Sequence, residues 1–340
     1  MKRQSLFFDS PGRMAIREEP IPEPSETEVL VRTIISAVSA GSELLVYRDQ
    51  VPPHMAVDAT IESLKGTFAF PMKYGYASVG EVISLGRSVD PLWQGRKVFS
   101  FQPHQNFFIT KVSDLFPVPP GVDGLDAVFL PFMETAIILL LDGQPSLGEQ
   151  VAVFGQGVVG LLVTALLGRI PLSRLLTLDL HTIRRRTSEQ LGAHRSVDPN
   201  EASIEEIRAF LQGADDYQGA DLTFELSGSP AALDQAIAVT GYSGRVVIGS
   251  WYGSKEVTIH PGGSFHRSRI KIISSQVSSI EPGLRGRWTK DRTLGLAWRF
   301  LEEIKPSRLI THTFPFSEAE KAYHLLDKNP GECLQVVLTY

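Results

Sequence analysis

The first 120 residues alternate short apolar runs with turn residues. The stretch "EVLVRTIISAVSA" (28–40) begins with apolar and polar residues in alternation, which predicts a half-buried strand. The pattern continues in "YGYASVGEVISLGRSV" (74–89), which predicts two short strands around glycines, and in "GRKVFSF" (95–101) and "NFFITKVSDLFPVPP" (106–120). We therefore expect a small all-β barrel in this part of the chain.

The pattern changes near Gly124. The stretch "GLDAVFLPFMETAIILLLDG" (124–143) has helical spacing, and from residue 150 onwards strand-like runs alternate with helix-like runs. Repeated β-α-β units predict a parallel sheet covered by helices, so the fold class is α/β. After "RIKIISSQV" (269–277) we expect a basic loop, two further helices and a closing strand, "LQVVLTY" (334–340).

Composition narrows the class of protein. The 340 residues are enough for about two domains, and 43% apolar with 21% charged residues is ordinary for a soluble globular chain. A net charge of −5 gives no reason to expect nucleic acid or an anionic membrane as partner. The single cysteine, Cys333, excludes an internal disulfide, and no apolar run is long enough for a signal peptide or a membrane span. We expect a cytoplasmic protein.

A glycine-rich turn is the clearest motif. "VAVFGQGVVGLL" places Gly155, Gly157 and Gly160 after a strand and at the start of a helix. In a dinucleotide site the first glycine permits the tight turn, the second lets the backbone approach a pyrophosphate, and the third lets the helix pack on the strand. The free N–H groups of the helix N-terminus then face the phosphates.

The choice between NAD and NADP depends on the end of the next strand. Asp179 in "LLTLDL" lies about 20 residues beyond the glycines, where an acid can bind the ribose diol of NAD and repel a 2′-phosphate. The cluster "HTIRRR", with Arg184, Arg185 and Arg186, could instead bind that phosphate or lie on a solvated helix face. We expect NAD, with NADP as the alternative.

With these motifs the chain resembles the medium-chain dehydrogenase/reductase superfamily, the relatives of zinc alcohol dehydrogenase. The resemblance covers essentially the whole length and includes "PLWQGRKVFSF", "SLGEQVAVFGQGVVGLL" and "LITHTFPFSEAEKAYHLL". It implies a GroES-like catalytic barrel over residues 1–136, a doubly wound Rossmann sheet over 137–277, and a return to the catalytic domain over 278–340. The family active site lies between the two domains.

The metal ligands of the family are missing from this sequence. "AGSEL" stands where zinc members carry C-G-[ST]-D-L, so that the cysteine becomes Ala40, and "YGYASVGEV" stands for G-H-E-x-x-G, so that the histidine becomes Tyr76. The third ligand aligns with Pro131. Because these three side chains cannot form an open zinc site, we expect no zinc. "SAGSELLVYRD", "PMKYGYASVGEV" and "SSQVSSI" are similar to a zinc-free subgroup that includes bacteriochlorophyllide hydroxyethyl dehydrogenase-like proteins.

Other groups must then polarise oxygen or move the proton. The resemblance places Ser42 at the family's proton-relay hydroxyl, but Leu45 replaces the histidine that follows it in the relay. Tyr76, Glu43 and His104 are further candidates, and each has a purely structural alternative in packing or loop anchoring. The candidate cofactor contacts beyond the glycines, Asp179 and Arg184 are Thr135 and Val159, from the resemblance, and Ser227, Gly249 and Ser250, at the ends of later strands.

Substrate contacts are expected from two places. Tyr47 follows the small-residue loop, and "IEPGLRGRWTKDRTLG" (280–295) carries Arg287 and Trp288 among other cations. Arginine recognises carboxylate or phosphate through paired donors, so an anionic or bulky substrate is one hypothesis. A dimer contact and a solvated loop are the alternatives.

Three functions are compatible with these features. The first is a zinc-independent NAD(P)-dependent oxidoreductase that interconverts an alcohol and a carbonyl. The second is an enoyl or quinone reductase that reduces a conjugated double bond, and the third is a dinucleotide-binding sensor without turnover. We also expect a homodimer, because the strand in "RIKIISSQV" could pair with a second copy.

Overall fold

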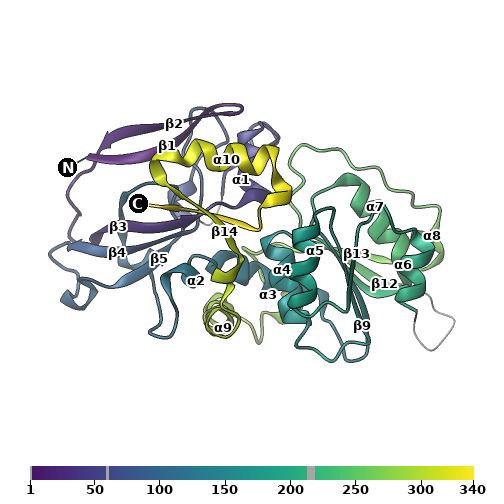
Figure 1. Cartoon of the computed structure of the whole chain (residues 1–340). Coiled ribbons are helices and arrows are strands. Elements are labelled where there is room, and N and C mark those ends of the chain that lie inside the picture. Colours follow the sequence, from purple (N-terminus) through teal and green to yellow (C-terminus); the bar gives the residue numbers. More distant parts are fainter. Residues whose placement is uncertain (1, 59–60, 213–218) are drawn as a thin grey trace. The chain divides into compact units, whose positions relative to one another are not determined.

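The computed structural model describes residues 2–58, 61–212 and 219–340, which form two compact units. The terminal unit contains residues 1–131 and 298–340, and the central unit contains residues 132–297. Both ends of the chain lie in the terminal unit (Figure 1). Each unit is described separately below.

The terminal unit is built on two sheets. β1 and β2 form an antiparallel ribbon, and a seven-stranded sheet has the order β14-β15-β3-β4-β5-β7, with β6 paired to β3. The strands are β1 (Lys2–Ser10), β2 (Arg13–Pro20), β3 (Glu28–Ala37), β4 (Ser78–Leu85), β5 (Lys97–Ser100), β6 (Phe107–Lys111), β7 (Phe116–Pro117), β14 (Ile310–Pro315) and β15 (Gln335–Thr339). The expected β-rich domain is therefore present, and the end of the chain returns to it. The stretch 74–89 forms one strand, β4, and not two.

Two helices cover the ribbon of the terminal unit. α1 (Ala40–Tyr47) follows β3 directly, and α10 (Ala319–Lys328) precedes the closing strand. Both helices contact each other and the β1–β2 ribbon (Figure 1). Their apolar faces bury Phe8, Tyr47 and Tyr323 in one core. This core fixes the small-residue loop at the start of α1. The short helix α2 (Gly124–Ala127) follows β7 in the chain.

The central unit is a six-stranded parallel sheet. Its order is β10-β9-β8-β11-β12-β13, so the sheet grows outwards from β8 in both directions. This is the strand order of a dinucleotide-binding Rossmann domain. The strands are β8 (Gln150–Phe154), β9 (Arg174–Leu178), β10 (Arg195–Val197), β11 (Ala220–Glu225), β12 (Thr240–Ile248) and β13 (Lys271–Ser274).

Helices connect these strands, as the alternating pattern predicted. They are α4 (Val158–Leu167), α5 (Thr182–Gln190), α6 (Ile204–Phe210), α7 (Pro230–Val239) and α8 (Ser264–Arg267). α6 and α7 pack against one sheet face, where Ala152, Phe154 and Leu176 are buried among them. Because side chains alternate along a strand, Val151 and Val153 point to the other face.

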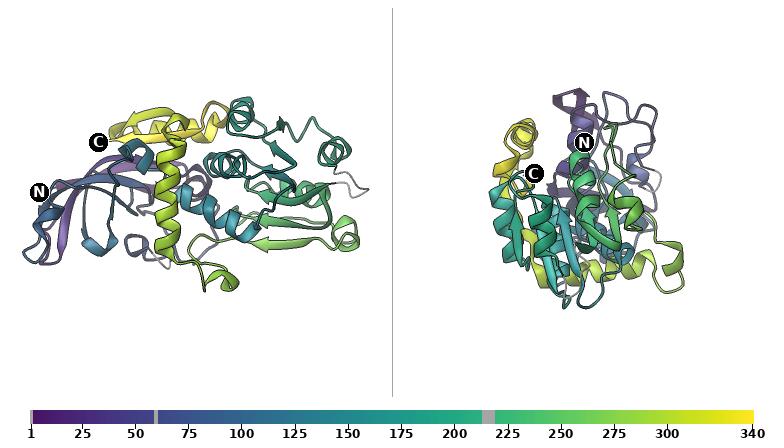
Figure 2. Two further views of the ribbon diagram at one scale, coloured as in Figure 1. Left: turned by 90° about the horizontal axis from the view of Figure 1, so that it is seen from below. Right: turned by 90° about the vertical axis from the view of Figure 1, so that its right-hand side faces the viewer.

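The boundaries between the units differ from the expected ones. They fall at 131/132 and 297/298, whereas the sequence placed them at 136/137 and 277/278. α3 (Leu130–Gly143) belongs almost entirely to the central unit, and the basic loop is held there by an ion pair of 2.6 Å between Lys290 and Glu134. α9 (Lys290–Ile304) is one unbroken helix that crosses the second boundary (Figure 2).

Within the described residues, none of the helices has the length and hydropathy needed to cross a membrane.

Candidate active site

Ser42 and Tyr76 come together at the start of α1. The Tyr76 hydroxyl lies 2.5 Å from Ser39 Oγ and 3.3 Å from Ser42 Oγ. Tyr76 and Ser42 are half-buried, and Ala40 beside them is also partly exposed. The Tyr76 phenol is therefore hydrogen-bonded to two serine hydroxyls, beside the small residues at the start of α1.

Glu43 and His104 lie behind this group, fully buried. His104 Nε2 is 3.0 Å from Glu43 Oε2, and the Tyr323 hydroxyl donates to the same oxygen. Glu43 Oε1 accepts a hydrogen bond of 2.7 Å from the Ser39 backbone N–H. Neither side chain reaches the surface, so the structure places both behind the residues that a substrate could touch.

The residues at the family's zinc positions do not fit a zinc ion. Ala40 has no donor atom, Pro131 is buried, and the Tyr76 hydroxyl is bonded to serines. Glu43 and His104, the nearest acid and imidazole, are already bonded to each other. No group of three histidine, cysteine, aspartate or glutamate side chains that could hold a metal occurs within residues 2–58, 61–212 and 219–340.

Tyr47 lies apart from the serine pair. Its ring packs against Tyr323, with centroids 5.9 Å apart, and the side chain is 7% exposed. It borders a surface hollow of about 380 Å³. The other residues that line this hollow are Gly12, Glu320, Lys321, His324, Leu325 and Asn329. Tyr47 therefore borders a hollow that includes none of Ser42, Glu43, Tyr76 or His104.

The glycine turn of the central unit fits a dinucleotide. Gly155 has φ +88°, and a Cβ there would be 2.5 Å from the Ser227 backbone nitrogen. A Cβ on Gly160 would clash with the Gly155 carbonyl, whereas a Cβ on Gly157 would meet no atom within 4 Å. The open position is therefore the one where a pyrophosphate must approach the backbone.

Two further features of the turn indicate a ligand. Gly157 is the N-cap of α4, and no side chain caps this N-terminus. Gln156 is fully buried, with its Oε1 accepting from Thr164 at 2.9 Å and its Nε2 without a partner in the structure. The helix end offers unused N–H groups and positive partial charge to an anion.

Asp179 is held at the end of β9, beside this turn. Its two oxygens accept hydrogen bonds of 2.8 Å from the Gln156 N–H and 2.9 Å from the His181 N–H. Arg184 Nη1 lies 3.7 Å from the carboxylate. Arg185 binds Asp198 and the carbonyls of residues 179 and 180 instead, so it anchors the loop, and Arg186 is exposed.

The ends of β11 and β12 contribute a cluster that the sequence identified only in part. Ser227 donates to Glu225 Oε1 at 2.5 Å, and Ser250 Oγ accepts from the Gly228 N–H at 2.8 Å. Glu225, fully buried, also accepts from the Tyr252 hydroxyl at 2.6 Å. A Cβ on the predicted Gly249 would contact Leu139 at 2.5 Å. Glu225 and Tyr252 were missed, although an acid at a strand end, as in Asp179, was a usable signal.

The remaining predicted cofactor residues also lie in the central unit. Thr135, on α3, and Val159, in the first turn of α4, are both half-buried. Thr135 follows Glu134, a buried carboxylate paired with Lys290. Burial raises the pKa of Glu134, and the Lys290 ammonium partly offsets this effect. All ten predicted cofactor residues therefore belong to one unit, at or beside the carboxyl ends of its strands.

In the basic loop, the Arg287 side chain makes no hydrogen bond or ion pair with any residue that the structure describes. Arg285 donates to the Ile280 carbonyl, and Arg292 donates to the Arg287 carbonyl and lies over the Trp288 ring, 4.1 Å from its centroid. Arg287 is exposed, and Trp288 is half-buried. The loop thus presents one guanidinium beside an aromatic ring.

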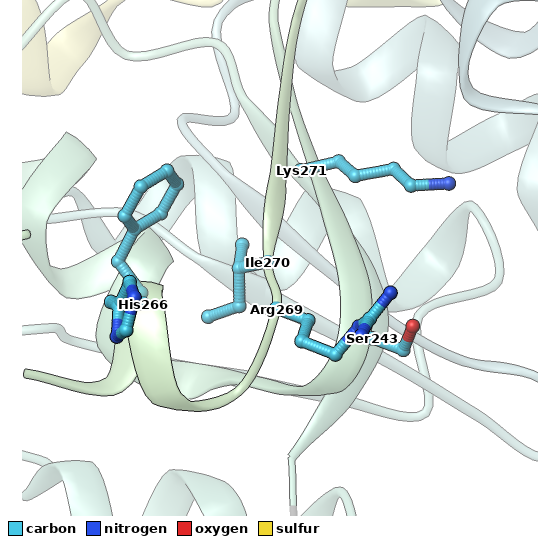
Figure 3. A pocket seen from close by; sticks show the side chains of 6 residues that line it. Ser243, His266, Arg269, Ile270 and Lys271 are labelled. Atoms are coloured by element: carbon cyan, nitrogen blue, oxygen red, sulfur yellow. The ribbon is translucent and has the colours of Figure 1, made fainter.

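A second hollow, of about 400 Å³, lies in the central unit away from the predicted residues. It is lined by Ser243, Phe265, His266, Arg269, Ile270 and Lys271. Because β13 begins at Lys271, this hollow lies at the amino end of a strand of the parallel sheet. The glycine turn lies at the opposite, carboxyl end, after β8. The Arg269 side chain extends towards Ser243, while His266 lies on the other side of the ribbon (Figure 3). The basic side chains of His266, Arg269 and Lys271 therefore do not point towards one common centre.

Comparisons with known proteins agree with this architecture. Residues 158–291 match the family model for zinc-binding dehydrogenases. The sorbitol dehydrogenase of Halalkalibacterium halodurans is 23% identical over 360 residues, which cover 96% of each chain. An Escherichia coli structure named short chain alcohol dehydrogenase, solved with NADH, has a TM-score of 0.80 at 19% identity, over 100% of this chain and 99% of that chain. A putative zinc-binding dehydrogenase of Sinorhizobium meliloti, bound to NADP, has a TM-score of 0.78 at 18% identity over all of both chains.

The strand order and the open glycine turn define a protein with a dinucleotide-binding Rossmann domain. Residues 158–291 match the zinc-binding dehydrogenase family, and over nearly its whole length the chain is similar to a sorbitol dehydrogenase and shares the fold of a dehydrogenase solved with NADH. The family and the fold class expected from the sequence are confirmed.

Proposed function

We propose that the protein interconverts an alcohol and a carbonyl with NAD(H) and without zinc, and that Tyr76 moves the proton. The observation that carries this proposal is the half-buried Tyr76 hydroxyl, bonded to Ser39 and Ser42, at the position where the resemblance places a metal-binding histidine. A nicotinamide cofactor, when bound, supplies or accepts the hydride. Gly155, Gly157, Gly160 and Asp179 would hold it.

The chemistry of the terminal unit is then a proton transfer. In reduction, the Tyr76 hydroxyl donates a hydrogen bond to the carbonyl oxygen and transfers its proton as that oxygen becomes an alkoxide. The hydroxyls of Ser39 and Ser42 stabilise the phenolate that is left. Ser42, which is half-buried, offers a route for a proton to return from solvent.

The environment of Tyr76 sets the direction of the pH dependence. Burial raises the pKa of the Tyr76 hydroxyl, and the hydrogen bonds with Ser39 and Ser42 lower it in part. The hydroxyl is therefore protonated throughout the neutral range. We expect carbonyl reduction to be constant with pH there and to fall only above pH 10, while alcohol oxidation, which needs the phenolate, rises with pH.

The variant Tyr76→Phe tests this role. It removes one oxygen from a half-buried ring, and we expect kcat/KM for carbonyl reduction to fall about 100-fold or more, the usual contribution of a positioned acid. Tyr74→Phe is the matched control, because Tyr74 is the adjacent buried tyrosine, 6.2 Å away between ring centroids. Its activity should stay within about threefold of the parent, since it lies outside the proposed proton path.

The assay uses NADH with a panel of ketones and aldehydes, beside quinones and enones. Turnover confined to quinones and enones would replace the proposal with conjugated-bond reduction. Cofactor binding without turnover on either panel would favour a sensor. No binding of NADH or NADPH at millimolar concentration would remove both the enzyme and the sensor. Equal rates for Tyr76→Phe and the parent would exclude Tyr76 as the proton donor.

Zinc independence is part of the proposal and rests on donor chemistry. Alanine and proline provide no ligand atom, and a neutral phenol bonded to two serines is a poor substitute for imidazole or thiolate. Because the chain is similar to zinc-binding dehydrogenases, the missing ligand atoms are a departure from the pattern of that family. The content of zinc per chain tests it directly.

A substrate with an anionic or bulky group is proposed from Arg287, Trp288 and Tyr47. Arg287 presents a guanidinium that pairs with no group in the described part of the chain, and Trp288 presents a ring already covered on one side by Arg292. Tyr47 could contribute only through the hollow that it borders. An unchanged KM in Arg287→Ala, compared with Arg285→Ala as control, would remove the anionic group from the proposal.

We also propose a homodimer formed through β13 and a cytoplasmic location. β13 pairs only with β12 in the described sheet, so its other edge offers backbone groups to a second copy. Light scattering should give twice the chain mass of 37.4 kDa, and a particle of one chain mass would contradict it. The single buried cysteine, Cys333, suits a reducing compartment, and fractionation of cells tests the location.

A further inference from the structure

Glu43 carries a negative charge into the centre of the terminal unit. Its carboxylate accepts from the Ser39 N–H at 2.7 Å, from His104 Nε2 at 3.0 Å and from the Tyr323 hydroxyl. Three donors on one fully buried carboxylate are the pattern of an ionised group, which only accepts. Glu43 also lies in the first turn of α1, where the helix dipole favours negative charge.

His104 completes the arrangement through both of its ring nitrogens. Its Nδ1 lies 2.7 Å from Ser36 Oγ, which in turn lies 2.9 Å from the Tyr340 hydroxyl. If Nε2 donates to Glu43, Nδ1 accepts from the Ser36 hydroxyl, and Ser36 accepts from Tyr340, so every group is satisfied without a positive charge. Ser36, His104 and Glu43 resemble a hydrolytic triad, but all three are fully buried, so no substrate reaches Ser36.

Two contacts connect this buried charge to Tyr76. Ser39 bonds to Glu43 through its N–H and to the Tyr76 hydroxyl through its Oγ. Gly75, with φ +113°, lets the His104 ring lie against the backbone beside Tyr76, because a Cβ there would be 2.6 Å from His104 Cδ2. The histidine, the glutamate and the serine therefore fix the segment that carries Tyr76.

We propose that Glu43 is a positioning residue for the proton donor: held by His104 and Tyr323, it fixes Ser39 against the Tyr76 hydroxyl and keeps a negative charge beside it. This inference rests on the proposed function, in which Tyr76 moves the proton. A nearby negative charge disfavours the phenolate, while the hydrogen bond from Ser39 favours it. Glu43 and Ser39 thus act on the same hydroxyl in opposite senses.

The other groups around Tyr76 are few. From α1 it faces Ser42 and Glu43, from its own segment the Tyr74 ring, and from the loop before β4 the Asp58 carboxylate, whose charge acts in the same sense as that of Glu43. Burial and the Glu43 charge raise the pKa of Tyr76, whereas Ser39 and Ser42 lower it. Among these groups, the Glu43 carboxylate accepts from the Ser39 N–H, and the Ser42 N–H donates to the Ser39 carbonyl.

The experiment compares pH profiles of hydride transfer in three variants. Glu43→Gln keeps the shape but removes the charge, and we expect the alkaline inflection of kcat to move about one unit to lower pH. Ser39→Ala removes the hydroxyl but keeps the N–H that Glu43 binds, and its inflection should move to higher pH. Glu43→Asp restores the charge with a shorter reach, so its inflection should return to the parent position while kcat falls about tenfold.

The outcomes separate this inference from the proposed function. If Tyr76→Phe retains the parent rate, Tyr76 is not the proton donor, and the positioning role proposed for Glu43 is also wrong. If Tyr76→Phe is inactive but Glu43→Gln and the parent have superimposable profiles, Tyr76 stands and the role of Glu43 is overturned. Equal profiles for Glu43→Gln and Glu43→Asp would indicate a purely structural role. If Glu43→Gln does not fold, Ser39→Ala decides: a profile that does not move, or moves to lower pH, contradicts the coupling.

Discussion

At the scale of single residues, we propose that one carboxylate and one guanidinium decide between NAD and NADP. The Asp179 oxygens are held in place by the N–H groups of Gln156 and His181, so the charge has a fixed position beside the glycine turn. Arg184, 3.7 Å away, partly neutralises it. The backbone bonds fix the acid, whereas the arginine approaches it loosely, and this asymmetry favours NAD over NADP.

Asp179→Asn should change this preference. The amide retains an acceptor oxygen but loses the charge that repels a 2′-phosphate, so we expect the ratio of NADPH to NADH affinity to rise about tenfold or more, a change of about 1.4 kcal/mol. Titration of cofactor fluorescence measures both affinities without turnover. Asp198→Asn is the control, because Asp198 ends the neighbouring strand but binds Arg185. Equal ratios in the two variants would mean that Asp179 does not select the cofactor.

Some candidate site residues could be predicted from the sequence, but their hydrogen-bond partners could not. Ser42 and Tyr76 were identified because each stands where a family motif has a reactive group. The pairing of Glu43 with His104, 61 positions apart, has no local pattern, because a buried ion finds its donors through the tertiary fold. Tyr323, 280 positions from Glu43, was for the same reason indistinguishable from any apolar-face tyrosine of a helix.

At the scale of elements, α4 depends on two glycines for different reasons. Gly160 lets the helix lie against the turn that follows β8, since a Cβ there would clash with the Gly155 carbonyl. Gly157, the N-cap of α4, has extended backbone that any residue adopts, and the space beside it is open. Gly160 therefore serves packing, and Gly157 serves a ligand.

A pair of alanine variants should separate these roles. Gly157→Ala should fold with nearly the parent stability but bind NADH at least about tenfold more weakly, because the new methyl occupies the approach of the pyrophosphate. Gly160→Ala should lose about 1–3 kcal/mol of unfolding free energy, the usual result of overpacking. Thermal unfolding without cofactor and NADH titration measure the two quantities. A stable Gly160→Ala variant, or unchanged binding by Gly157→Ala, would contradict the division.

The long periodic elements were predictable and the short ones were not. The alternation from residue 150 gave β8, α4, β9, α5, β11, α7 and β12, because all of them except α5, which buries only Ser188, bury a run of apolar side chains. β10, only three residues long, and the seven-residue α6 were missed, since their ranges are too short for a period. The stretch 74–89 was predicted as two strands around glycines, but Gly80 lies inside the single strand β4, where a Cβ would meet the Arg32 carbonyl of β3 at 2.5 Å.

At the scale of the whole molecule, we propose that this chain, which is similar to zinc-binding dehydrogenases, uses a phenol where they use a metal ion. The loss is not confined to one position: Ala40, Tyr76 and Pro131 come from three separate segments. Glu43, at the start of α1, is bonded to His104 and Tyr323. Such coordinated change indicates a rebuilt site, because a merely decayed one would retain some ligands and leave buried polar groups unpaired.

Metal analysis of the purified, untagged protein distinguishes a rebuilt site from a hidden metal centre. We expect far less than one zinc per chain by elemental mass spectrometry, and carbonyl reduction that is unaffected by prolonged dialysis against a chelator, since the donor in this chain is a phenol. A positive control is the same preparation of a zinc-containing relative, which must show its metal. One zinc per chain that survives dialysis would mean that Glu43 and His104 open from their mutual bond to bind it, and the proton-donor role of Tyr76 would then be wrong.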